Sequence, residues 1–161
     1  MDLVVLAGLQ GSGKSTFHAS RFAATHRYVS KDRMRSARDK DARQRREIEA
    51  AAAAGESVVV DNTNVRREDR AALVALARTL GMRPVLYWFP PDVPASLARN
   101  ARREGKARVP PVAIFATRAR LEVPDATEGF DAVFAVVPDE AGGFSTVPIA
   151  FDAPRPPDRT P

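Results

Sequence analysis

Eight residues near the start of the chain, from Gly8 to Ser15, read Gly-Leu-Gln-Gly-Ser-Gly-Lys-Ser. This spacing matches the phosphate-binding loop G-x-x-x-x-G-K-S/T, in which successive backbone N–H groups point at phosphate oxygens. The motif requires a strand before it and a helix after it. The apolar run 3–7 suits a buried strand, and a helix is expected from Lys14. The sequence therefore predicts binding of a nucleoside triphosphate.

The loop and the residue that follows it supply the predicted nucleotide contacts. These residues are Gly8, Leu9, Gln10, Gly11, Ser12, Gly13, Lys14, Ser15 and Thr16. Lys14 is expected to reach the β- and γ-phosphates, and Ser15 to ligate Mg²⁺. The sequence has no Asn-Lys-x-Asp guanine signature. ATP and Mg²⁺ are therefore the expected nucleotide and metal.

Short apolar runs alternate with helical stretches along the chain, which predicts an α/β fold built on an open parallel sheet with helices on both faces. Helices are expected over 14–24, 33–54, 67–80, 93–103 and 112–121. Strands are expected over 28–30, 57–61, 83–89 and 132–137, with an edge strand over 145–151. We expect one domain over 1–151 and a disordered tail over 152–161, which is mostly Pro, Asp and Arg.

An aspartate, Asp61, ends the clearest buried strand, Ser57-Val58-Val59-Val60-Asp61. Ligands of open parallel sheets gather at the carboxyl ends of the strands. An acid at this point can hold Mg²⁺ directly or through water, as in other phosphate-loop enzymes. The alternative is that Asp61 only caps the next helix. Residues 62–64, Asn-Thr-Asn, are expected to form a turn and cap.

A second polar segment, Ser30-Lys31-Asp32-Arg33-Met34-Arg35, also follows a predicted strand. Asp32 should therefore face the same cleft as the phosphate loop. If a helix begins at Asp32, Arg35 lies one turn further on and points the same way. A kinase needs such a base and cation near the acceptor hydroxyl. Asp32 as a helix N-cap explains the residue equally well.

The formal net charge of +5 is concentrated in one region of the chain. Residues 99–120 contain seven positive side chains and one acidic side chain, Glu104. Clustered charge of one sign attracts polyanions, although a solvated helix face is the simpler alternative. No apolar run approaches the ~20 residues that span a bilayer, so no membrane partner is expected. The absence of cysteine and of a basic leader before an apolar stretch agrees with a cytoplasmic location.

Four blocks of the chain, in order across about residues 3–121, resemble the phage-type polynucleotide 5′-kinases and related small phosphate-loop kinases. They are the loop with Thr16, the block Ser30-Lys31-Asp32-x-x-Arg35, the turn 61–64 with Arg70 beyond it, and Arg99-Asn100-x-x-Arg103 followed by Val109-Pro110. The Asp-x-x-Arg and Arg-Asn-x-x-Arg blocks are more specific than the loop.

This resemblance implies a phosphate-loop kinase with a short helical lid at about 99–120. It implies that Asp32 is the general base on a nucleic-acid 5′-hydroxyl and that Arg35 binds the adjacent phosphate. Arg103 would reach the transferring phosphoryl group from the lid, with Arg99 assisting at the nucleotide. Lys14, Asp32, Arg35 and Arg103 are therefore the expected catalytic residues, and Arg99 is an expected nucleotide contact.

The sequence thus favours a kinase that moves the γ-phosphoryl group of ATP to the 5′-hydroxyl of a DNA or RNA end. Two other functions are open at this point. One is a kinase for a small-molecule acceptor on the same scaffold. The other is a nucleotide-binding ATPase or switch without an acceptor. Oligomeric state is not predicted.

Overall fold

The computed structural model describes residues 1–34, 36–139 and 142–150 of the chain. Its centre is a six-stranded sheet in the order β2-β3-β1-β4-β5-β6. The strands are β1 (Asp2–Ala7), β2 (His26–Val29), β3 (Ser57–Asp61), β4 (Arg83–Trp88), β5 (Ala132–Pro138) and β6 (Phe144–Pro148). All neighbouring strands are parallel except β5 and β6. The predicted α/β class is confirmed.

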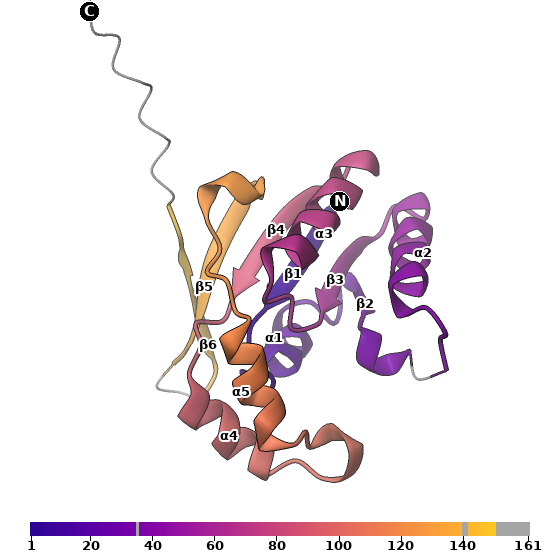
Figure 1. Ribbon diagram of the computed structural model, residues 1–161. Coiled ribbons are helices and arrows are strands. Elements are labelled where there is room, and N and C mark those ends of the chain that lie inside the picture. Colours follow the sequence, from indigo (N-terminus) through magenta and orange to yellow (C-terminus); the bar gives the residue numbers. More distant parts are fainter. Residues whose placement is uncertain (35, 140–141, 151–161) are drawn as a thin grey trace, which may run out of the picture.

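Five α-helices and three 3₁₀ helices connect the strands in the part of the chain that the structure describes. They are α1 (Lys14–Arg21), η1 (Lys31–Arg33), α2 (Lys40–Ala53), α3 (Arg67–Thr79), α4 (Val93–Ala101), η2 (Gly105–Ala107), α5 (Pro111–Ala119) and η3 (Ala126–Glu128). Figure 1 shows α4 and α5 projecting beyond the end of the sheet toward which β3 and β4 run. Among the described residues, no helix has the length and apolarity to cross a membrane.

The strand order places the ends of three strands together. β1 lies between β3 and β4, and Leu6 is in register with Asp61 while Val29 is in register with Val60. The chain changes direction of winding at β1, and such a switch point leaves a crevice at the carboxyl ends of the strands. The loop after β1, the residues after β2 and the turn after β3 therefore meet at one edge.

Each face of the sheet packs against its own helices. Leu3 and Val5 face a core that includes Ile48 of α2 and Leu73 of α3. Alternate residues such as Val4 point to the other face and pack against Phe17 of α1. Because strand side chains alternate between faces, the continuous apolar run of β1 is buried on both sides. The phosphate loop therefore leaves a strand that is held rigidly in the middle of the core.

One predicted helix is wrong in its extent. A single helix was expected over 33–54, but the structure has η1 (Lys31–Arg33) and a separate α2 (Lys40–Ala53). The side chain of Asp39 accepts a hydrogen bond from the backbone N of Ala42 at 2.9 Å, and so starts α2 as its N-cap. High helix propensity made the predicted helix begin too early, at residue 33. In the structure, the Asp39 cap sets the start of α2 at Lys40.

A fully buried ion pair joins α3 to η3. The Arg70 guanidinium binds both carboxylate oxygens of Glu128, at 2.6 and 2.5 Å, and both side chains have at most 1% exposure. Its remaining nitrogen donates to the carbonyls of Asn64 and Val65 at 3.1 and 3.0 Å. The pair is satisfied in all directions, which is what makes burial of two charges tolerable. It also anchors the end of the turn after β3.

This geometry predicts the effect of breaking the pair. Glu128→Gln leaves the Arg70 charge buried without a counter-charge and should destabilise the fold by about 3–5 kcal/mol. Urea unfolding followed by circular dichroism measures the loss. As a control, Arg83→Ala removes an exposed pair with Asp2 and should leave the urea midpoint nearly unchanged. Equal midpoints for the two variants would contradict the role given to the buried pair.

Candidate active site

The phosphate loop takes its shape from glycines that later elements approach closely. Gly13 has φ 104° and directly precedes α1, and a Cβ at this position would lie 2.6 Å from the Phe144 ring of β6. Gly11 has φ 75°, and a Cβ there would lie 2.6 Å from the carbonyl oxygen of Ser96 in α4. Both positions require glycine for backbone conformation and for space. The loop is therefore closely approached by β6 and by α4.

The lysine of the loop is buried against the loop itself. Lys14 Nζ donates to the carbonyl oxygens of Gly8 and Leu9 at 3.0 and 2.7 Å. Burial lowers the pKa of Lys14 to about 8. The charge of Asp61 opposes this shift, that of Arg103 adds to it, and that of Asp32 opposes it. Three residues predicted from distant segments thus lie within electrostatic range of Lys14.

The Asp61 carboxylate binds two side chains from other segments at the end of the sheet. Its side chain is buried, and Oδ2 accepts hydrogen bonds from Ser15 Oγ at 2.7 Å and from Tyr28 OH at 2.8 Å. Burial, reinforced by the charge of Asp61, raises the pKa of Tyr28 to about 12, so the phenol keeps its proton. Asp61 is not a cap of the next helix, which was the alternative. Tyr28 was missed by the sequence analysis.

These oxygens fit the metal that the motif implies. A hydroxyl and a carboxylate are hard oxygen ligands of the kind that Mg²⁺ prefers. The described residues contain no group of three His, Cys, Asp or Glu side chains able to hold a metal by themselves. Mg²⁺ commonly binds through one or two protein oxygens together with water and substrate phosphates. Ser15 and Asp61 match that pattern.

The turn after Asp61 connects the phosphate loop to the segment that holds Asp32. Asn62 accepts from the backbone N of Lys31 at 2.9 Å and donates to Gln44 at 2.7 Å. Asn64, at φ 44°, donates to the Leu6 carbonyl at 2.8 Å. The amides therefore brace separate segments. The expectation that these amides cap the next helix, α3, is therefore wrong.

Asp32 has an exposed carboxylate at the edge of this crevice. Ser30 caps η1 and Asp39 caps α2, so the alternative role of Asp32 as a helix cap does not apply. No hydrogen bond to its carboxylate occurs within the described residues. Its carboxylate oxygens are therefore available to a ligand. Arg35, its expected partner, lies outside the described residues.

The predicted lid, about residues 99–120, covers the end of α4, η2 and α5, and it forms two side-chain hydrogen bonds with the phosphate loop. Gln10 donates to Thr117 Oγ1 of α5 at 2.9 Å, and Arg99 donates to the Gly11 carbonyl at 3.4 Å. Asn100 closes the lid loop, because its side chain accepts from Val109 N at 3.0 Å and donates to Val109 O at 2.8 Å. The sequence analysis had no signal for the contacts of Gln10 and Thr117.

Two cavities border this arrangement. Arg99 lines a small one, of about 50 Å³, together with Ser12 and Phe144. The other, of about 350 Å³, lies between α2 and α3 and begins at Lys31, next to Asp32, and at Asn64. The first cavity touches the phosphate loop, whereas the second is lined by Lys31, the neighbour of Asp32 in the chain.

Comparison with known proteins supports the fold described above. A family model described as an AAA domain matches residues 3–124. The chain belongs to this family. Similar solved structures include a gluconokinase from Sinorhizobium meliloti 1021, at 21% identity and a TM-score of 0.60, covering 84% of this chain and 81% of that chain.

Two further structures widen the range of activities on this fold. Kti12 from Chaetomium thermophilum, in complex with ADP-AlF3, is 20% identical with a TM-score of 0.64, covering 87% of this chain and 92% of that chain. A fungal RNA kinase is 12% identical with a TM-score of 0.63, covering 84% of this chain but 38% of that chain. At these identities the structures establish the fold. The chain has the fold of a phosphate-loop kinase or ATPase-like domain.

The lowered pKa of Lys14 predicts how nucleotide binding depends on pH. Only the protonated ammonium attracts phosphate, and the free protein keeps that proton below about pH 8. Affinity for MgATP should be constant below this pH and should fall above it, by up to about tenfold per unit. Calorimetric titrations from about pH 7.5 to about 9.5 measure the profile. Lys14→Ala should bind weakly and without this dependence, and a flat wild-type profile would contradict the assignment.

Proposed function

We propose that the protein is an ATP-dependent kinase that transfers the γ-phosphoryl group to the 5′-hydroxyl of a DNA or RNA end. The observation that carries the acceptor class is a contrast between two sets of arginines. Within the described residues, the arginines of 99–120 have no carboxylate partner. Eight of the twelve described arginines elsewhere form ion pairs: Arg27, Arg43, Arg45, Arg66, Arg67, Arg70, Arg78 and Arg83.

Guanidinium groups without a carboxylate partner, concentrated in one segment, favour an anionic ligand. Arginine is suited to phosphate because its planar fork forms two parallel hydrogen bonds. A polynucleotide supplies several phosphates beyond the one being transferred. A small neutral acceptor supplies none, so it would leave most of the lid charge without a function.

The reaction would use the residues around the crevice as follows. The acceptor 5′-oxygen attacks the γ-phosphorus while its proton passes to Asp32, and the bond to the oxygen that bridges the β- and γ-phosphorus breaks. The products are ADP and a 5′-phosphorylated end. Lys14 and Arg103 would neutralise charge that grows on the phosphoryl oxygens, which is the main source of catalysis in such transfers. Arg35 would hold the phosphate next to the reacting hydroxyl.

Ser15 and Asp61 would hold Mg²⁺, directly or through water. When bound, the metal supplies charge neutralisation between the β- and γ-phosphates. Tyr28 would keep the Asp61 carboxylate oriented by donating its hydrogen bond. Asn62 would position the backbone that carries Asp32, because it accepts from the neighbouring Lys31 amide.

A small-molecule acceptor is the second candidate, and one observation favours it. The cavity of about 350 Å³ is lined by the carboxylates of Asp41, Glu68 and Asp69 and by the cations of Lys31 and Arg45. Its wall includes Leu73 and Leu76 of α3. A polar, uncharged molecule suits this lining better than a phosphate does. The two candidates share the phosphate loop and Asp32, and differ in where the acceptor lies.

Replacement of Asp32 tests the proposal at the reacting hydroxyl. Asp32→Asn cannot accept the proton, so kcat for a 5′-hydroxyl oligonucleotide should fall at least about 100-fold, with ATP affinity little changed. Transfer of label from [γ-³²P]ATP and calorimetric ATP binding measure the two quantities. The control is Asp131→Asn, which lies on the surface and pairs with Arg78. If ATP binding is lost while folding is preserved, Asp32 belongs to the nucleotide side and the proposed role is wrong.

A further inference from the structure

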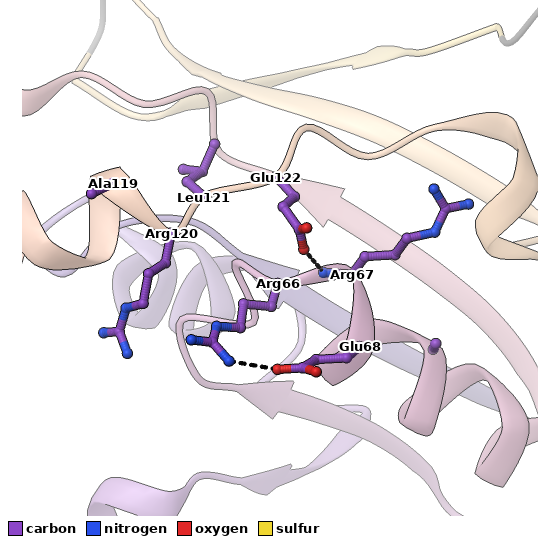
Figure 2. A pocket seen from close by; sticks show the side chains of 8 residues that line it. Arg66, Arg67, Glu68, Ala119, Arg120, Leu121 and Glu122 are labelled. Carbon is purple, nitrogen blue, oxygen red and sulfur yellow. Dashed lines mark hydrogen bonds and ion pairs between the residues drawn. The ribbon is translucent and has the colours of Figure 1, made fainter.

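A cavity of about 680 Å³ lies between the first turn of α3 and the last turn of α5, apart from the phosphate loop. It is within the size range of ligand pockets, about 300–1,000 Å³. Figure 2 shows its residues at close range. They are Arg66, Arg67, Glu68, Ala71, Ala119, Arg120, Leu121 and Glu122. We call this cavity the α3–α5 groove.

The walls of the groove are bound to each other by Glu122. Its backbone N donates to the carbonyl of Val65 at 2.9 Å. Its carboxylate accepts from the backbone N of Arg67 at 2.5 Å and so caps α3 from another segment. Arg66, the N-cap residue of α3, makes no side-chain cap of its own. The groove is therefore a built feature, with the end of the lid bound to the start of α3.

The three arginines of the groove have different partners. Arg67 extends away from the other two in Figure 2 and binds Asp125 at 2.8 and 3.2 Å. Arg66 binds Glu68 at 2.6 Å in a pair exposed to solvent. Arg120 donates only to the Ala116 carbonyl of its own helix, at 3.3 Å, within the part of the chain described. The guanidinium groups of Arg66 and Arg120 end on the same side of the groove (Figure 2).

The groove carries a net positive charge, because its three arginines outnumber its two glutamates. The Glu122 carboxylate is already bound to the α3 backbone. An exposed pair such as Arg66–Glu68 contributes little to stability, so a phosphate can replace Glu68 as the partner of Arg66 at small cost. Arg120 has no carboxylate partner among the described residues, so a phosphate would not have to displace one. Two forked donors on one side suit a phosphate group.

Both walls of the groove follow directly from segments that contact the proposed site. Thr117, which contacts the phosphate loop through Gln10, precedes Arg120 by about one helical turn. Arg66 follows the turn whose Asn62 accepts from the Lys31 amide beside Asp32. A strand whose 5′ end is at Asp32 would thus reach the groove with a phosphate further along the strand.

We infer that the α3–α5 groove binds an internal phosphate of the acceptor strand, beyond the phosphate next to the reacting hydroxyl, through Arg66 and Arg120. This inference rests on the proposed polynucleotide kinase activity. It gives the enzyme a preference for acceptors several nucleotides long. A 5′-hydroxyl dinucleotide has a single phosphate, the one next to the nucleoside that carries the reacting hydroxyl. It therefore has no second phosphate to place in the groove.

The test compares a 5′-hydroxyl dinucleotide with a single-stranded 5′-hydroxyl octanucleotide in wild type, Arg66→Ala and Arg120→Ala. The ratio of kcat/KM for the longer acceptor to that for the shorter should fall about tenfold in each variant. The Kd of a 3′-labelled octanucleotide, from fluorescence anisotropy, should rise by a similar factor. The slope of log Kd against log salt should fall by about 0.7 for one lost phosphate contact on a single strand.

The control variant is Arg78→Ala, which removes one positive charge from α3 about 18 Å from Arg66 along the helix. Arg78 pairs with Asp131 and lies outside the groove. The Arg78→Ala variant should show the same preference for the longer acceptor, and the same slope of log Kd against log salt, as wild type. If Arg120→Ala changes neither the ratio nor the slope, or if Arg78→Ala changes them equally, the inference is overturned while the kinase activity stands.

Failure of the proposed function would be seen separately. If wild type labels neither acceptor, the polynucleotide kinase proposal is wrong, and the anisotropy series alone decides the groove. A weaker octanucleotide Kd and a lower salt slope in Arg120→Ala then support a strand-binding groove. Unchanged values overturn it. Displacement of the octanucleotide by millimolar inorganic phosphate as effectively as by an unlabelled strand would also overturn it, because the site would then take any phosphate.

Discussion

The candidate active site depends on one buried carboxylate, that of Asp61. Its Oδ2 joins the first turn of α1 through Ser15 and strand β2 through Tyr28, while its backbone ends β3. Residues from three segments far apart in sequence are therefore fixed around one oxygen atom. The parallel register of β1, β2 and β3 makes this contact possible, because it brings the carboxyl ends of the strands to one edge.

The other parts of the site are tied to this centre by polar contacts. Asn62 holds the backbone beside Asp32, and the buried pair of Arg70 and Glu128 binds the end of the same turn. Glu122 then connects the start of α3 to the exit of the lid. A single connected set of hydrogen bonds thus extends from the phosphate loop to the α3–α5 groove. Within the described residues, the arginines of 99–120 form no ion pair with an acidic side chain.

Much of this could be predicted from the sequence, for physical reasons that also explain the misses. The strands before the loop and before Asp61 are continuous apolar runs, and the loop motif fixes its own neighbours. The prediction of one helix over 33–54 relied on helix propensity. Propensity does not detect a local cap, and here the N-cap Asp39 starts α2 separately from η1. Tyr28 and Glu128 were missed because their roles arise from strand pairing and from a contact across 58 residues. The roles of Asp32, Arg35 and Arg103 stay predictions.

The most direct measurement is a competition among acceptors for one labelled phosphoryl group. Wild-type protein with Mg²⁺ and [γ-³²P]ATP is given equal concentrations of a 5′-hydroxyl oligonucleotide, the same oligonucleotide with a 5′-phosphate, a nucleoside and gluconate. The account predicts that label enters only the 5′-hydroxyl oligonucleotide and is removed by phosphatase. Label in the nucleoside or gluconate, or release of labelled phosphate without any labelled acceptor, would contradict it.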